Sequence, residues 1–257
     1  LTYALSQQNN TETGWGRAGE SWNFIETLGA LGGEAWFRLG DKDLALHTAR
    51  TQTLKRGATL SQATAAITQS MGIEHTVAPM SDSPVRTIVH SDQGDLAFQH
   101  YFVREGCGPK VSGFSFDGIA NAKLNPLIRE WLADCDGVII CPSNPFVSVD
   151  PLLHLDGFGE ALKSLPVIAV SPIVGGIAIK GPAAKMMHEL NMPATALAVA
   201  DHYQGLIDGF VVDQTDAALV EQFNVPTIST PSVMVTLQDR IDLARTCVSF
   251  LASLSSN

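Results

Sequence analysis

One segment of the chain places short polar side chains between prolines, a composition suited to binding an anion. It spans residues 141–148 and offers hydrogen-bond donors at Ser143, Asn144 and Ser148. A continuous apolar run typical of a buried strand precedes it. Because ligands of open parallel sheets bind beyond the carboxyl ends of the strands, we predict that this loop faces a ligand. Prolines that only turn the chain between strand and helix would explain it equally well.

A second segment, residues 171–182, follows another apolar run and combines glycine with lysine. Gly175 and Gly176 would let backbone amides approach a phosphate, and Lys180 would add a positive charge. Chain turning is again an equal explanation for this loop taken alone. Two such loops after successive strands favour a nucleotide or diphosphate site.

The first third of the chain gathers Trp15, Trp22 and Trp36, followed closely by Arg38. Aromatic residues at this density form either the core of a lobe or a pocket that stacks on a flat ring, and the core is the commoner outcome. Arg38 would be a cation at the edge of either arrangement. Asp41 could bind a cation, but capping a helix explains it at least as well.

Between two predicted strands, Ser81, Asp82 and Arg86 come close together, either as a polar site or as an Asx turn beside a solvated arginine. The sequence has no Walker A motif, no GxGxxG and no HExxH, and its seven histidines are scattered. These absences exclude a P-loop kinase and an ordinary dinucleotide dehydrogenase. No catalytic base can be named from spacing.

The period of the apolar residues divides the chain into three segments. Residues 1–72 are expected to form a helical substrate lobe inserted in the core, with Ser21 and Asp41 as helix caps and Thr59 with Gln62 as a capping box. Residues 73–118 predict an antiparallel β segment, with strands at 85–90 and 96–103. Residues 119–257 predict a Rossmann-like nucleotide-binding core.

That core begins where Asn125 and Pro126 form a helix start. Apolar runs at 137–141, 167–170 and 210–212, and a less regular one at 227–229, each precede a loop and a helix. Runs that are apolar on both faces are typical of a parallel sheet covered on both sides. We therefore predict an α/β fold: a Rossmann-like, mostly parallel sheet with helices on both faces, plus the helical lobe and the antiparallel β segment.

Composition limits the classes of partner. The 257 residues are 45% hydrophobic and 16% charged, and their formal net charge of -10 argues against nucleic-acid binding, which needs cations to neutralise phosphates. No apolar stretch is long enough for a membrane span. The four cysteines have no CxxC spacing, so we expect reduced, mostly buried thiols and a cytoplasmic location.

Seven motifs together resemble one family, the 2-phospho-L-lactate transferases of coenzyme F-420 biosynthesis. They occur in the family's order at residues 13–17, 36–50, 79–86, 98–99, 141–150, 171–176 and 180–187. The resemblance implies transfer of a phospholactyl-type group from a guanosine diphospho donor to the ribityl hydroxyl of the deazaflavin 7,8-didemethyl-8-hydroxy-5-deazariboflavin, with release of GMP and with Mg²⁺ as cofactor.

The resemblance also implies roles for individual residues. Arg38 falls at the family's basic deazaflavin-contacting position, and we assign Trp15, Asp41, Ser81 and Asp82 to the same substrate. The two polar loops would face the nucleotide and its diphosphate through Ser143, Asn144, Ser148, Gly175, Gly176 and Lys180.

Family members begin with a Gly-rich strand and loop, followed by two aspartate-bearing segments that hold the metal. The resemblance here starts directly after those segments, at Leu1. We therefore expect the family aspartates upstream of Leu1, with no metal ligands in the sequence given. A homodimer is one assembly open to such a protein.

The phospholactate, phosphoenolpyruvate and phosphoglycerate donors differ only near a shared carboxylate, and the sequence does not choose among them. The alternative function is that of a related family with a similar core, a nucleotide-sugar-binding regulatory protein. The tryptophans and Arg38 favour the transferase, because a flat tricyclic acceptor needs a slot with aromatic edges.

Overall fold

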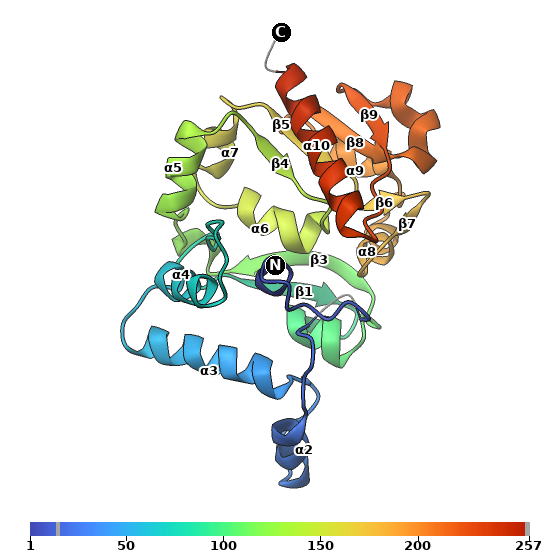
Figure 1. Cartoon of the computed structure of the whole chain (residues 1–257). Helices are drawn as coiled ribbons and strands as arrows, with labels where there is room; N and C mark the ends of the chain where they lie inside the picture. The colour runs from blue at the N-terminus through green and yellow to red at the C-terminus, as the bar shows by residue number, and fades with distance from the viewer. Residues whose placement is uncertain (14–15, 255–257) are drawn as a thin grey trace.

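A four-stranded parallel sheet lies at one end of the molecule, and a small antiparallel sheet lies between it and a helical extension (Figure 1). The computed structural model describes residues 1–13 and 16–254. This arrangement confirms the predicted fold class. None of the described helices is both long and apolar enough to cross a membrane.

The parallel sheet has the strand order β4-β5-β8-β9. Its strands are β4 (Val138–Ile140), β5 (Val167–Val170), β8 (Gly209–Asp213) and β9 (Thr227–Thr230). Each predicted apolar run is one of these strands. All three pairings are parallel, with Val138 opposite Val167, Ile168 opposite Gly209 and Phe210 opposite Thr227.

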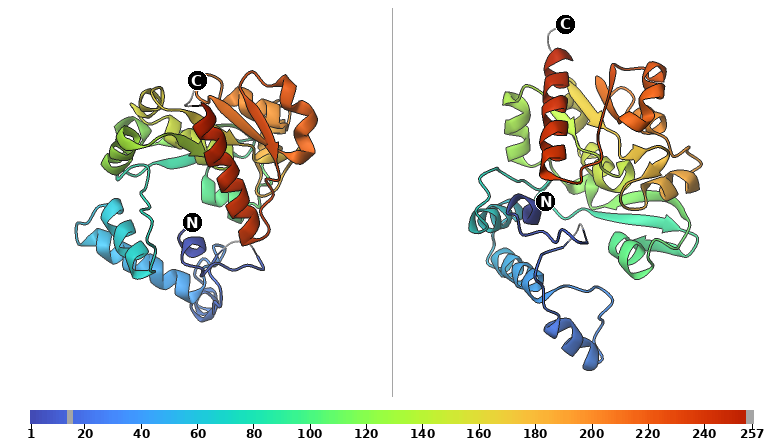
Figure 2. Two further views of the ribbon diagram at one scale, coloured as in Figure 1. Left: turned by 45° about the horizontal axis from the view of Figure 1, so that its top comes forward. Right: turned by 45° about the vertical axis from the view of Figure 1, so that its right-hand side comes forward.

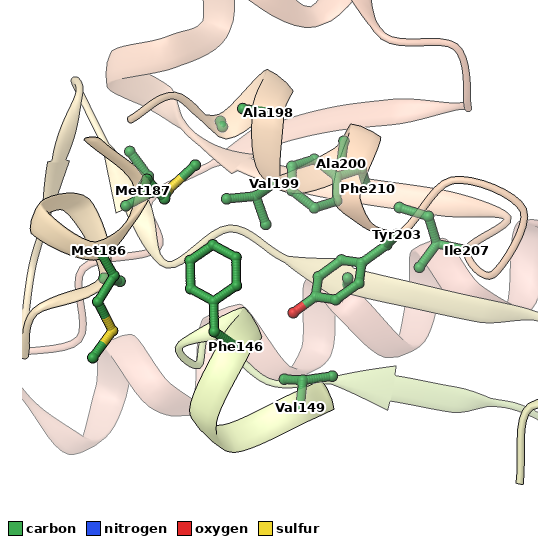
Figure 3. Close-up of a cluster of buried hydrophobic side chains, with 14 of the residues drawn as sticks. Phe146, Val149, Met186, Met187, Ala198, Val199, Ala200, Tyr203, Ile207 and Phe210 are labelled. Carbon is green, nitrogen blue, oxygen red and sulfur yellow. The ribbon is translucent and has the colours of Figure 1, made fainter. Parts of the chain in front are cut away.

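Alternate residues of the central strands pack into two separate hydrophobic cores. In β5, Val167 and Ala169 join the larger core, whereas Ile168 and Val170 join the smaller one. The larger core includes side chains from α7 (Phe158–Leu162), α8 (Ala183–Glu189) and α9 (Ala196–His202) and is shown in part in Figure 3. The smaller core includes side chains from α10 (Leu237–Leu254). Helices therefore cover both faces of the sheet, as predicted.

Helix α10 runs along one side of the sheet and is the last helix of the chain (Figure 2). In the chain, η2 (Ile119–Asn121) and α5 (Pro126–Asp134) precede β4. The Asn125 side chain accepts a hydrogen bond from the Leu127 amide at 3.0 Å, which confirms the predicted start of α5. After β4 come η3 (Pro145–Val149) and α6 (Asp150–Leu153), and after β8 comes η4 (Gln214–Gln222).

The antiparallel sheet has the order β2-β1-β3 and consists of β1 (Arg86–Ser91), β2 (Gly94–Ala97) and β3 (Val111–Asp117). The prediction of a strand over 96–103 is wrong beyond Ala97. The chain instead forms the π-helix η1 (His100–Arg104). Within η1 only Tyr101 is fully buried, while residues 102–104 are exposed. One inward residue per turn suits a helix and does not suit the alternation of a strand.

The helical extension contains α1 (Thr2–Leu5), α2 (Asn23–Ala30), α3 (Asp41–Lys55) and α4 (Leu60–Ser70). The capping box of Thr59 and Gln62 is present as predicted. The other two caps differ from expectation. Ser21 does not cap α2, and Asp41 is the first residue of α3, after the N-cap residue Gly40.

The Asp41 carboxylate accepts hydrogen bonds from the amides of Asn23 at 3.2 Å and Phe24 at 3.1 Å, in the first turn of α2. It therefore caps a neighbouring helix in place of its own. No element crosses the predicted limits at 72 and 118 in the described part of the chain, but the division into domains itself stays a prediction.

The cysteine prediction needs one correction. All four thiols are free, but Cys247 alone is buried, Cys107 and Cys135 are half-buried and Cys141 is exposed. Burial, together with the nearby Cys141, raises the pKa of Cys247 to about 11. Cys141 is exposed because it lies just past the end of β4, where the chain leaves the sheet.

Candidate functional site

A cavity of about 230 Å³ lies beyond the carboxyl ends of β4, β5 and β9. Open parallel sheets bind their ligands at this edge. The wall brings together three stretches that are distant in sequence: Pro142, Ser143 and Asn144 after β4; Ser171, Pro172, Val174, Ile179, Lys180 and Ala183 after β5; and Ser232, Val233, Met234 and Arg240 after β9. Both predicted loops therefore contribute to one cavity.

The loop after β4 is shaped by Asn144. Its side-chain oxygen accepts hydrogen bonds from the amides of Phe146 at 3.0 Å and Val147 at 3.4 Å, and its Nδ2 donates to Met186 Sδ at 3.2 Å. The Ser143 hydroxyl has no hydrogen-bond partner among the described residues, so it is available to a ligand. Ser148 lies within η3 and is not part of the cavity wall.

The loop after β5 begins with a buried serine. Ser171 Oγ donates to the Ile173 carbonyl at 2.8 Å and accepts from the Ile173 amide at 3.1 Å, so this hydroxyl shapes the backbone. Lys180 lies in the wall, but Gly175 and Gly176 do not. They form the turn of a hairpin between β6 (Ile173–Val174) and β7 (Ile177–Ala178).

The turn explains these glycines without a phosphate. Gly175 has φ of 55° and Gly176 has φ of 81°, a conformation that glycine adopts without steric cost. The Gly175 amide donates to Asp216 Oδ2 at 3.0 Å, so it is already paired. We therefore correct the expectation that Gly175 presents a free amide to a phosphate.

The third stretch of the wall, which follows β9, is held in place by Asp213 at the end of β8. Its carboxylate accepts hydrogen bonds from the Ser232 amide at 2.8 Å and hydroxyl at 3.1 Å, and from the Thr215 amide at 2.9 Å and hydroxyl at 2.7 Å. Burial opposes ionisation of this carboxyl, but the four hydrogen bonds outweigh it and lower its pKa. Asp213 thus fixes Ser232 at the cavity.

Ser232 and Arg240 are wall residues that no motif pointed to. One signal in the sequence could have found Arg240. It lies in the first turn of α10, where the helix dipole disfavours a cation. An arginine at this position adds nothing to helix stability through the dipole, so its charge is available for another role.

The cavity wall is positively charged. Among the described residues, Lys180 and Arg240 are the only ionisable side chains of the wall, and none of its lining residues is a carboxylate. Neither cation forms an ion pair with any residue that the structure describes. In a chain with a formal net charge of -10, two unpaired cations in one cavity favour an anionic ligand that carries more than one charge.

A second hollow, of about 590 Å³, lies in the helical extension. Arg17, Trp22, Arg38 and Asp43 line it together with Glu20 and nearby glycines and polar residues. The Arg38 guanidinium lies 4.9 Å from the centre of the Trp22 ring, and its Nη2 lies 3.9 Å from Glu26 Oε1. Trp15, assigned to the same substrate, falls outside the described residues.

The remaining three predicted substrate residues make structural contacts. Asp41 binds the first turn of α2 and also accepts from Ser21 Oγ at 2.7 Å. Hydrogen bonds from Ser21, Asn23 and Phe24 lower its pKa. The structure therefore places Asp41 as a link between two helices and not in the wall of the hollow that contains Arg38.

Ser81 and Asp82 line a different hollow, of about 440 Å³, together with Asn125. Asp82 Oδ1 accepts from the Ser61 amide at 2.7 Å and hydroxyl at 2.8 Å, which caps the start of α4. Ser81 Oγ accepts from the Ser83 amide at 3.1 Å. The structure thus brings Ser81 and Asp82 together but does not bring them to Arg38.

No group of three or more His, Cys, Asp or Glu side chains is placed to hold a metal ion within residues 1–13 and 16–254. The described residues therefore do not form a site that fits Mg²⁺. The requirement for Mg²⁺ stays a prediction, and so does the position of its ligands.

Comparison with known proteins identifies a family. The model of the family described as "2-phospho-L-lactate transferase CofD" matches residues 3–238. A protein from Methanococcoides burtonii named 2-phospho-L-lactate transferase is 33% identical over 99% of this chain and 84% of its own length. One of the same name from Methanosarcina acetivorans is 36% identical over 85% of this chain and 71% of its own length.

A Streptomyces avermitilis protein named phosphoenolpyruvate transferase is 37% identical over 95% of this chain and 80% of its own length. Among solved structures, two of a Bacillus halodurans protein, one of them described as a member of the UPF0052 family, superpose with TM-scores of 0.54 and 0.56. They cover 80% and 82% of this chain, and 71% and 72% of the solved chains, at 16% identity. These structures share the fold.

Proposed function

The chain belongs to the 2-phospho-L-lactate transferase CofD family and is a transferase, and on that premise we propose its two substrates and the place of each. The donor is a guanosine nucleotide whose diphosphate carries a phospholactyl-type or phosphoenolpyruvyl group. The acceptor is the ribityl hydroxyl of the deazaflavin 7,8-didemethyl-8-hydroxy-5-deazariboflavin. The second product is GMP, and the reaction belongs to coenzyme F-420 biosynthesis.

The observation that carries the donor proposal is the charge of the cavity wall. Lys180 and Arg240 are unpaired within the described chain, and no acid lines the cavity. A bound diphosphate would supply the negative charge that balances these two cations. The Ser143 hydroxyl, also without a partner among the described residues, supplies a further hydrogen bond to a phosphate oxygen.

The proposed reaction needs charge neutralisation and alignment and no covalent enzyme intermediate. The acceptor hydroxyl oxygen forms a bond to the phosphorus that carries the acyl group. The bond from that phosphorus to the bridging oxygen breaks, GMP leaves with this oxygen, and the hydroxyl proton passes to solvent. Lys180 and Arg240 together offset the negative charge of the diphosphate as the transfer proceeds. No step here is routed through Mg²⁺, which stays a predicted cofactor.

The acceptor proposal depends on the hollow that contains Arg38. Its guanidinium and the Trp22 ring lie together at an exposed edge, with Arg17 in the same wall. A flat ring with an acidic, phenol-like hydroxyl complements an aromatic face and a cation. Relatives are named for transfer of 2-phospho-L-lactate or of phosphoenolpyruvate, and either acyl group is consistent with the cavity.

A transfer assay with a matched lysine control tests the proposal. The protein is incubated with the deazaflavin and each guanosine donor, and GMP and phosphoryl-deazaflavin are quantified by chromatography. We expect the two products in equal amounts. Lys180→Gln should lower the rate about tenfold, the effect of losing one charge-assisted hydrogen bond. Lys163→Gln, which removes an exposed lysine paired with Glu160 on α7, should leave the rate unchanged. GMP release without deazaflavin product would contradict the acceptor assignment.

A further inference from the structure

We infer that Arg240 is the residue by which the cavity distinguishes a nucleoside diphosphate from a nucleoside monophosphate. This inference rests on the proposed function, because it concerns the same nucleotide site. The family model matches residues 3–238, and Arg240 lies two positions beyond the matched segment.

The acids nearest to Arg240 on its own helix have other partners. The Asp239 carboxylate accepts from the amides of Val235 at 2.9 Å and Thr236 at 2.6 Å. Asp242 accepts from Gln238 Nε2 at 2.8 Å and lies 3.9 Å from Arg245 Nη1. Arg240 therefore lines the cavity without a carboxylate partner among the described residues.

Lys180 and Arg240, the two cations of the wall, belong to different kinds of secondary structure. Lys180 follows β7 in an irregular segment, whereas Arg240 belongs to the 18-residue helix α10. Leu243, Cys247 and Phe250 anchor that helix in the smaller core. The packing of α10 thus holds the backbone of Arg240 in place, and the planar guanidinium can bind two phosphate oxygens at once.

The cavity encloses only the charged part of a nucleotide. Its volume of about 230 Å³ is below the roughly 300–1,000 Å³ of sites that enclose a whole small molecule. Ile179, Val233 and Met234 line the cavity and are 45%, 40% and 39% exposed, and so offer an apolar rim to the nucleoside. Inside the cavity, two cations match two phosphates.

A diphosphate can therefore engage Lys180 and Arg240 together, but a monophosphate can engage only one of them. We assign the phosphate shared by GDP and GMP to Lys180 and the additional phosphate to Arg240. Since transfer removes that additional phosphate from the nucleotide, GMP loses the Arg240 contact once the reaction is complete. The same residue then contributes both to donor binding and to release of the product.

Nucleotide titrations by calorimetry, in buffer free of divalent cations, test the inference. For the unmodified protein we expect GDP to bind at least about tenfold more tightly than GMP, one charge-assisted contact being of this size. Arg240→Gln should weaken GDP binding by about the same factor while changing GMP binding less than about threefold. Arg240→Lys should keep part of the preference because it keeps the charge.

Arg245→Gln is the matched control, since it removes one cation from the same helix outside the cavity wall. It should leave both affinities unchanged, and circular dichroism and thermal unfolding of every variant establish that it is folded. If Arg240→Gln weakens the binding of GDP and of GMP equally, or weakens the binding of neither, the inference is overturned while the proposed function stands. If the unmodified protein binds neither nucleotide in this buffer nor after addition of Mg²⁺, the proposed donor itself is wrong.

Discussion

The polar residues around the cavity divide into those bound to the backbone and those left for a ligand. Asp213 and Ser171 pair fully with neighbouring amides, carbonyls and hydroxyls and set the shape of the wall. Ser143, Lys180 and Arg240 have no such partners in the described chain. Residue type alone does not separate these two groups, because serine occurs in both.

Asp213 provides a test of the supporting group. We expect Asp213→Asn to lower the free energy of unfolding at pH 7 by about 1–3 kcal/mol, because an amide cannot accept all four hydrogen bonds. The lowered pKa of Asp213 stabilises the folded protein above the usual aspartate pKa near 4. That stabilisation is lost as the pH falls through the pKa of the folded state.

Urea unfolding at pH 7 and at pH 3 measures both effects. The difference between the unmodified protein and Asp213→Asn should be larger at pH 7 and should shrink at pH 3. Asp136→Asn, at an exposed aspartate without a partner among the described residues, should show no difference at either pH. A difference that does not change with pH would mean that the charge of Asp213 is unimportant.

Arg38 tests the acceptor site at the same scale. We expect Arg38→Ala to weaken deazaflavin binding roughly 3- to 10-fold, the range of an exposed cation–π contact together with one charge contact. Guanosine diphosphate binding should be unchanged, because Arg38 lines a different hollow. Fluorescence titration with each ligand measures the two effects separately.

Arg104→Ala is a suitable control for Arg38. Its guanidinium also lies against a tryptophan, 6.0 Å from the Trp36 ring centre, and near an acid, Glu105. Arg104 does not line the Arg38 hollow, so its loss should leave both ligands bound as before. Equal loss of both ligands in Arg38→Ala would mean that Arg38 supports the structure.

At the scale of elements, the link from Asp41 to the start of α2 joins two helices that have few other connections. Helix α2 has one buried residue, Ile25, and α3 has none. Elements with so few buried contacts open locally at low free-energy cost. The position of Trp22, next to α2, therefore depends in part on the Asp41 carboxylate, while Glu20 binds the amides of Lys42 and Asp43 at the start of α3.

We expect Asp41→Ala to increase amide exchange in α2 several-fold, most at Asn23 and Phe24, because their amides lose their acceptor. Hydrogen exchange measured by mass spectrometry on α2 and on α10 shows whether the effect is local. Asp95→Ala, which removes a carboxylate paired with His90 in the antiparallel sheet, is the control and should leave α2 unchanged. Unchanged exchange in α2 would show that other contacts hold this helix.

The secondary-structure elements differ in how well sequence patterns could predict them. The strands of the parallel sheet were predictable because burial on both faces leaves continuous apolar runs such as 167–170. The π-helix η1 was not, because Phe102 and Val103 favour a strand by type and only their tertiary surroundings leave them exposed. Likewise, the cap from Asp41 to α2 joins residues 17 to 18 positions apart, which no local pattern encodes.

For the whole molecule, the separation between a negative chain and a positive cavity is the main electrostatic feature. The formal net charge of -10 was known from composition, and Lys180 was predicted as a phosphate ligand. That Lys180 and Arg240 line one cavity could not be predicted without the fold, because the two residues are 60 positions apart and the cavity forms where the ends of β5 and β9 come to one edge of the sheet. Composition thus argues against nucleic acid as a partner, and the topology of the sheet brings the two cations to one cavity.

The two separate cores have a consequence for protein engineering. Helix α10 contacts the sheet through an apolar cluster of its own, with Ile168, Val170 and Val211 on the sheet side, apart from the larger core. Helix α10 can therefore be replaced by another helix that keeps Leu243, Cys247, Phe250 and Leu251, because these four residues form its apolar contact with the sheet. Its first turn, which carries Arg240, lies outside this cluster, so the proposed nucleotide preference can be altered there without rebuilding the sheet.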